Sequence, residues 1–373
     1  MRTAPNISLQ PTPLHGAAEF DRWPTYSMYP CISLTRIFAV TAFTLLSALA
    51  QASTGLTEIE STGSGPVTVF YPSSSEATLI VRAPFALDVA WQGPPVRGNG
   101  RLIVISHGSP GSPWVHADLA RTLVEAGFVV AVPEHHADNY KDPRSPGPES
   151  WKRRPAEVSH AIDVVGQDPR FGPLLALDKV GMFGMSAGGH TALILAGGRW
   201  SPAHLKQHCE TNIAEDFQAC VGLATRLNGD IFDGLKTRIA QWVIRSKLGD
   251  TTWYSHTDPR IAAIVAGVPF AADFDATSLA APRVPLGIVT AREDKWLMPR
   301  FHGERILQTC STCERVADLA NGGHGGLLSP LPPERSGLIA DLINDPPSFD
   351  RTRLVPELNR KIAKFFQRYL VQG

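Results

Sequence analysis

The sequence predicts an α/β fold with a mostly parallel central sheet, helices on both faces and an inserted helical cap. Two patterns predict it. From Arg101 onward, apolar runs of strand length alternate with segments whose apolar residues recur at helical spacing. This order is typical of right-handed βαβ units and a parallel sheet. The expected strands are also apolar on both faces, as they must be when helices cover both sides of a sheet.

The expected elements follow in order along the chain. Residues 53–91 alternate loosely between apolar and polar and predict antiparallel strands. Strands of the central sheet are then expected at 102–105, 128–133, 177–186, 261–270 and 284–291, with a short one near Val316. Helices are expected at 114–128, 149–168, 187–198 and 354–370. Together these elements predict one domain over residues 53–373.

Residues 199–258 interrupt this alternation. They contain two helix-like segments, 210–223 and 234–248, and no apolar strand. We interpret the interruption as the inserted helical cap, and we expect it to shape the substrate pocket.

The N-terminal segment has the features of a secretory signal peptide. Arg36 precedes the apolar run Ile37–Ala50, which is shorter than a bilayer-spanning helix. A small-x-small cleavage site follows and ends at Ala52. The alternative is a buried helix or a membrane anchor.

The segment before it differs in character. Residues 1–27 are rich in proline and lack periodicity, which predicts a non-native or disordered extension, with Met28 as the natural start. Residues 28–52 would then be the signal peptide. We therefore expect a periplasmic or secreted protein that keeps no stable membrane anchor after cleavage.

Composition limits the partners. The 35 basic residues balance the 35 acidic ones, so the chain has no overall basic charge of the kind that binds nucleic acid. No polybasic stretch for anionic lipid is present in the sequence either. The sequence predicts no particular oligomeric state.

Four cysteines follow the predicted cleavage site: Cys209, Cys220, Cys310 and Cys313. An even number in an exported protein predicts two disulfides, and local pairing of Cys209 with Cys220 and of Cys310 with Cys313 would close short loops. A four-cysteine zinc site is the alternative. It fits less well, because the first pair is separated by more than the two to four residues typical of zinc ligands.

The stretch Gly184-Met185-Ser186-Ala187-Gly188 is a G-x-S-x-G sequence between an expected strand and an expected helix. This context is typical of a nucleophile held on a sharp turn at a sheet edge, where glycines let the helix and a neighbouring strand come close. The N-terminus of the following helix also stabilises developing negative charge. The alternative is a serine at a glycine-rich helix start with no catalytic role.

A serine nucleophile needs a base, and His324 is our candidate. It lies in the stretch NGGHGG after the last short strand, and the glycine pairs on both sides predict a flexible loop over the sheet edge. His190, one helical turn after the serine, is expected to face away. His204 and His208 lie in the insert at i, i+4 spacing and predict a solvated helix face rather than a metal site.

The acid should follow the strand at 284–291, where Glu293 and Asp294 stand. We expect Asp294 to orient the imidazole and stabilise its charged form, with Glu293 as the reserve. Each of these carboxylates, and a lone histidine as well, would otherwise be an ordinary surface residue.

The oxyanion hole needs backbone N–H donors. We expect one from Ala187, directly after the nucleophile, and one from Ser109 in the loop after the strand at 102–105. Pro110 has no N–H to offer. His107 in the same loop is expected to shape the loop rather than act as a base.

The ordered stretches SHGSPG, GMSAGG, TARED and NGGHGG resemble the α/β-hydrolase superfamily. VPEHHADN, RRPAEVSHAID and GGHGGLLSP are more narrowly similar to the dienelactone hydrolase and platelet-activating factor acetylhydrolase group. The likeness covers most of the region from about residue 54 to residue 371. It implies the α/β-hydrolase fold and a secreted serine hydrolase with Ser186, Asp294 and His324 as the triad, and with Ser109 and Ala187 as oxyanion donors.

The resemblance also implies the chemistry. Dienelactone hydrolases proper use a cysteine nucleophile, so the serine favours ordinary carboxylic esters, cleaved through an acyl-enzyme without metal or cofactor. The expected partner is a small-molecule ester substrate. The alternatives are a serine peptidase or amidase on the same fold, and a catalytically inactive α/β-hydrolase-like binding protein.

Overall fold

The computed structural model describes residues 52–61, 65–82 and 84–372. The predicted extension 1–27 and the predicted signal peptide up to residue 51 lie outside the described residues. Within the described ranges, no helix is both long enough and apolar enough to cross a bilayer.

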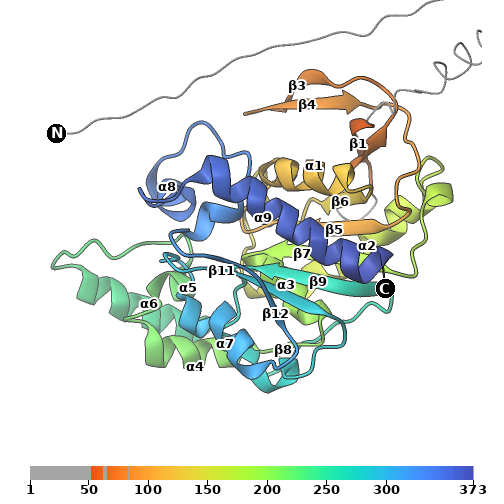
Figure 1. The fold of residues 1–373 in the computed structure, drawn as a ribbon. Coiled ribbons are helices and arrows are strands. Elements are labelled where there is room, and N and C mark those ends of the chain that lie inside the picture. The colour runs from red at the N-terminus through yellow and green to blue at the C-terminus, as the bar shows by residue number, and fades with distance from the viewer. Residues whose placement is uncertain (1–51, 62–64, 83, 373) are drawn as a thin grey trace, which may run out of the picture. The chain divides into compact units, whose positions relative to one another are not determined.

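A ten-stranded sheet forms the centre of the fold, in the order β12-β11-β9-β7-β5-β6-β2-β1-β4-β3 (Figure 1). The six strands from β12 to β6 run parallel, and antiparallel pairing of β2 with β6 attaches the N-terminal strands. The sheet is thus mostly parallel, as predicted. Its strands are β1 (Ser53–Ile59), β2 (Val67–Ser73), β3 (Thr78–Arg82), β4 (Phe85–Trp91), β5 (Leu102–Ser106), β6 (Val129–Pro133), β7 (Val180–Met185), β9 (Ile261–Gly267), β11 (Leu286–Ala291) and β12 (Glu314–Leu319).

Helices cover both faces of this sheet. Helices α1 (Ala117–Glu125) and α9 (Arg351–Phe366) pack on one face, and α2 (Pro148–Gln167) and α3 (Ala187–Leu195) on the other (Figure 1). The side chains of β5 show why its sequence is continuously apolar. Ile103 and Ile105 are buried with residues of α1 and α9, whereas Leu102 and Val104 are buried with residues of α2 and α3.

Three helices lie between α3 and β9: α4 (Pro202–Asn212), α5 (Phe217–Val221) and α6 (Asp233–Lys247). The sequence predicted one helix over 210–223. The structure instead begins α4 earlier, ends it at Asn212 and starts α5 at Phe217. The break lets the carboxylate of Asp216 turn inward, where it is buried. A small two-stranded sheet, β8 (Arg199–Trp200) with β10 (Phe274–Asp275), flanks the insert.

Two disulfides form within the described residues, with the short loops that the sequence predicted. Cys209 bonds to Cys220, and Cys310 bonds to Cys313 just after α7 (Gly303–Thr309). The first disulfide joins α4 to α5 across the break between them. The cysteines are therefore engaged in pairs rather than gathered as zinc ligands.

The parallel strands place their carboxyl ends at one edge of the sheet. The loops after β5, β7, β11 and β12 all begin there, because parallel neighbours point the same way. These are the loops that carry the predicted oxyanion donors, nucleophile, acid and base.

Candidate active site

Ser186 lies on a strained turn between β7 and α3. Its backbone has φ +58° and ψ −117°, a region that residues with side chains rarely adopt. Its N–H donates to the carbonyl of Gly267 at 3.0 Å, and its own carbonyl accepts from the N–H groups of His190 and Phe270 at 2.9 and 3.2 Å. These bonds to the next strand and to the helix offset the strain and hold the turn in place.

The two flanking glycines of the motif are required by close backbone contacts. A Cβ on Gly184 would lie 1.9 Å from the carbonyl oxygen of Gly188. A Cβ on Gly188 would lie 1.9 Å from the carbonyl oxygen of Ser106 at the end of β5. No side chain fits at either position, so the motif brings α3 directly against the neighbouring strand.

The predicted acid and base are hydrogen-bonded to each other. His324 Nδ1 lies 2.7 Å from Asp294 Oδ2, and both side chains are buried. The other oxygen of Asp294 accepts from the backbone N–H groups of Trp296 and Leu297 at 2.8 and 2.9 Å. Glu293, by contrast, is exposed. A carboxylate can only accept, so Nδ1 carries the proton and Nε2 is left as the basic nitrogen.

The turn that carries His324 is held by side-chain contacts, unlike the flexible loop that the sequence predicted. His324–Leu327 form a 3₁₀ turn. Arg351 of α9 donates to the carbonyls of Gly325 and Leu328 and pairs with Asp345. A Cβ on Gly325 would lie 2.2 Å from a backbone oxygen, so this glycine permits close packing.

The same turn packs beside the nucleophile turn. Leu327 packs on Gly267: a Cβ on Gly267 would lie 2.4 Å from Leu327 Cδ2. The carbonyl of Gly267 in turn accepts the hydrogen bond from the Ser186 N–H. Among the described residues, the Ser186 hydroxyl and the His324 ring do not hydrogen-bond to each other. Catalytic hydrogen bonds are often long without substrate and tighten only in the complex.

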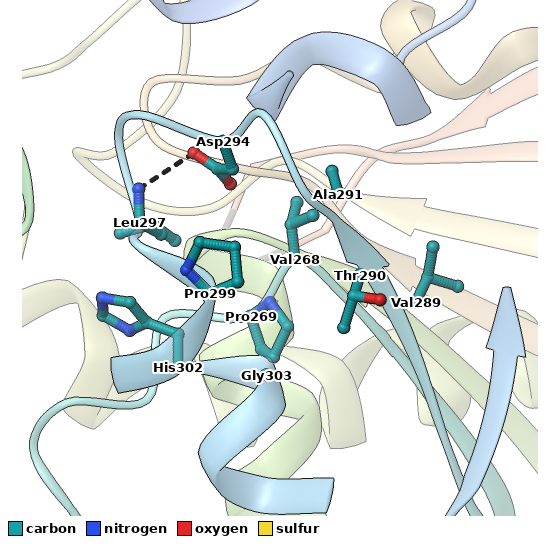
Figure 2. Close-up of a pocket in the computed structure, with 10 residues that line it drawn as sticks. All are labelled: Val268, Pro269, Val289, Thr290, Ala291, Asp294, Leu297, Pro299, His302 and Gly303. Atoms are coloured by element: carbon teal, nitrogen blue, oxygen red, sulfur yellow. Dashed lines mark hydrogen bonds between the residues drawn. The ribbon is translucent and has the colours of Figure 1, made fainter. Parts of the chain in front are cut away.

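A small cavity of about 10 Å³ lies beside Asp294. That volume is about the room that one water needs, and it is far too small for an ester substrate. Figure 2 shows its lining and the hydrogen bond between Asp294 and the Leu297 N–H. The lining residues are Val268, Pro269, Val289, Thr290, Ala291, Asp294, Leu297, Pro299, His302 and Gly303.

The loop after β5, which carries the predicted oxyanion donor Ser109, lies against Ser186. A Cβ on Gly108 would be 3.9 Å from Ser186 Oγ. In the part of the chain that the structure describes, the N–H groups of Ser109 and Ala187 donate to no other protein group. They are therefore free to donate to an oxyanion.

A buried arginine, which the sequence analysis did not single out, holds this loop. Arg154 of α2 donates to the carbonyls of His107 and Gly108 at 2.5 and 3.2 Å. Its guanidinium also binds Asp138 through Nη2 at 2.8 Å and through Nε at 3.1 Å, and both side chains are fully buried. Asp138 in turn accepts from the Ser109 hydroxyl. One ion pair thus fixes the loop after β5 at two points.

Two neutral histidines complete the support of the loop. His107 Nδ1 lies 2.7 Å from the Gly108 carbonyl, and burial lowers its pKa well below 6.5. His135 bridges Ser106 Oγ at 2.7 Å and Glu157 at 2.6 Å. Burial, with the nearby Arg154 charge, lowers the pKa of His135 well below 6.5. In the part of the chain that the structure describes, neither ring hydrogen-bonds to Ser186, and His107 contacts a carbonyl of its own loop, as expected of a residue that shapes that loop.

His208 is buried, so the expectation of a solvated helix face is wrong for this residue. Its Nε2 lies 2.8 Å from Asp216, and His302 Nε2 lies 3.0 Å from the same oxygen. Burial alone would raise the pKa of Asp216, but the hydrogen bonds from both imidazoles outweigh it and lower that pKa. The second oxygen of Asp216 accepts from the Met298 N–H at 3.1 Å. The insert is thereby joined to the loop of the candidate acid.

A comparison of the chain with protein-family models finds no match, and a comparison with curated proteins finds none either.

Proposed function

We propose that the chain is a secreted serine hydrolase of the α/β-hydrolase superfamily that cleaves carboxylic esters. The observation that carries the proposal is the buried Asp294–His324 pair, which stands at the same sheet edge as the strained Ser186 turn. The order nucleophile, acid, histidine along the chain is the order of that superfamily. Within it, the motifs favour the dienelactone hydrolase and platelet-activating factor acetylhydrolase group.

In the proposed reaction, Ser186 Oγ attacks the ester carbonyl carbon while its proton passes to His324 Nε2. Asp294 stabilises the imidazolium, and the N–H groups of Ala187 and Ser109 bind the oxyanion. The intermediate collapses to the acyl-enzyme as the alcohol leaves with the proton from His324. Water then repeats the sequence and releases the acid.

We also propose that the protein is exported to the periplasm or secreted. Disulfides persist in oxidising compartments such as the bacterial periplasm and the extracellular space. The two disulfides and the signal-like N-terminal segment both support it.

A fluorophosphonate probe tests the proposal directly. We expect it to label the wild-type protein, and we expect Ser186→Ala to lose both the label and the hydrolysis of p-nitrophenyl esters. The exposed Ser74 provides a matched control, because Ser74→Ala should keep both. Absence of labelling in the wild type would favour a binding protein. Faster turnover of aminoacyl amides than of acetyl esters would favour a peptidase or amidase.

A further inference from the structure

Helix α6 presents an apolar face to solvent. Its exposed side chains include Leu235, Ile239, Trp242 and Val243, and the exposed Phe232 stands at its N-cap. These residues recur at three- and four-residue intervals along one side of the helix. Trp242 is 69% exposed, and the adjoining Ile231 is 90% exposed. Only Ala240 and Ile244 of this helix are buried. A contiguous exposed apolar face of this kind marks an interaction site.

Basic residues flank the apolar face on both sides. At 100° per residue, Arg238 and Arg245 lie along one border and Lys236 and Lys247 along the other. Lys236 pairs with Asp233, and Arg245 pairs with Glu210. Arg238 and Lys247 are exposed and form no ion pair among the described residues. The sequence lacks a continuous basic run, but the helix gathers these dispersed charges around its apolar face.

The charge of this segment differs from that of the rest of the chain. Residues 226–247 hold five basic and two acidic residues, whereas the whole chain has 35 of each. Tryptophan and phenylalanine on one face with lysine and arginine at its borders are typical of helices that lie in the headgroup region of a membrane. Figure 1 shows α6 beside α4 and α5, away from the central sheet.

We infer that α6 docks the protein on a phospholipid surface that contains anionic headgroups. Its apolar face enters the boundary between headgroups and acyl chains, and the flanking basic residues contact the lipid phosphates. A symmetric pair of two copies through the same face is disfavoured, because such an interface would bring the basic borders of one helix against those of the other. The inference concerns binding alone and does not depend on hydrolysis.

The apolar contribution can be tested with vesicles. We expect the full-length protein to sediment with vesicles of phosphatidylcholine and phosphatidylglycerol, and Ile239→Ser/Trp242→Ser to weaken that binding at least about tenfold. The matched control is Leu79→Ser/Val81→Ser, which removes two comparably exposed apolar side chains from β3. The control carries the same N-terminal segment as the wild type and the Ile239→Ser/Trp242→Ser variant. It should bind the vesicles as the wild type does.

The charges can be tested with the same assay. Arg238→Gln/Lys247→Gln should lose about fivefold in affinity for each charge on vesicles with phosphatidylglycerol, and very little on phosphatidylcholine alone. Hydrolysis of a water-soluble ester should stay unchanged in every variant, which separates this test from that of the proposed function.

Two results would overturn the inference. One is vesicle binding that the Ile239→Ser/Trp242→Ser variant retains in full. The other is a wild-type protein that ignores vesicles but sediments as a dimer in the ultracentrifuge, with the dimer lost in that variant. The second result would assign the face to another copy of the chain.

Discussion

The replacement Asp294→Asn isolates the role of the proposed acid, because the structure dictates how the new amide must sit. Oδ1 of Asp294 accepts from two buried backbone N–H groups, those of Trp296 and Leu297. An asparagine that turned its NH₂ group toward them would leave both donors unpaired, at a cost of about 1–3 kcal/mol each. The amide oxygen must therefore take the Oδ1 position, and the NH₂ group must face His324.

This orientation reverses the protonation of the imidazole. The NH₂ group donates to His324 Nδ1, so that nitrogen becomes the acceptor and the proton moves to Nε2. The ring then has no lone pair to receive the proton of Ser186. The equivalent change in serine proteases lowers kcat about 10⁴-fold, which is about 5.5 kcal/mol of transition-state stabilisation. We expect a loss of that order here.

Steady-state hydrolysis of p-nitrophenyl acetate measures the effect, and thermal unfolding shows whether the variant is folded. The control is Glu293→Gln, at the exposed neighbouring position, which should keep wild-type kcat. A folded Asp294→Asn protein with kcat within about tenfold of wild type would refute the reasoning. Loss of activity in Glu293→Gln instead would move the acid to the neighbouring residue.

Two further predictions concern stability. Arg154→Met should lower the free energy of unfolding by about 3–5 kcal/mol, because it leaves the buried Asp138 carboxylate without its ion-pair partner. Urea unfolding measures this change. The matched control is Arg153→Met on the same helix, which should lower the free energy of unfolding much less. Burial lowers the pKa of His116 to about 4, so above pH 6.5 the ring is neutral in both states and stability is full. Between pH 6.5 and 4 only the unfolded chain gains the proton, so the free energy of unfolding should fall by up to about 3 kcal/mol. The variant His116→Phe cannot titrate at this position. If it loses stability as steeply over this pH range, His116 is not the group responsible.

The strained turn at Ser186 could be predicted from the sequence because its requirements are local. Gly184 and Gly188 are needed by backbone contacts within the turn and with the adjacent strand, so they appear as a fixed pattern around Ser186. The alternation of strands and helices could likewise be predicted, because it follows from the spacing of apolar residues along the chain. The edge at which Asp294 and His324 meet followed from parallel order alone.

The residues that support the site could not be predicted in the same way, because their partners are remote in sequence. Arg154 binds carbonyls more than forty residues away. The sequence held one signal: Arg154 lies on the same face of α2 as the buried Trp151, Val158 and Ile162. An arginine within an apolar stripe has to be paired inside the protein, but only the fold identifies Asp138 as its partner.

Asp216 shows how the insert and the candidate site depend on each other. Its carboxylate binds His208 from α4, His302 just before α7 and the N–H of Met298, four residues after Asp294. Three segments thus share one buried charge, and none of them can move without leaving part of it unpaired. The position of the inserted helices is therefore coupled to the loop that carries the proposed acid.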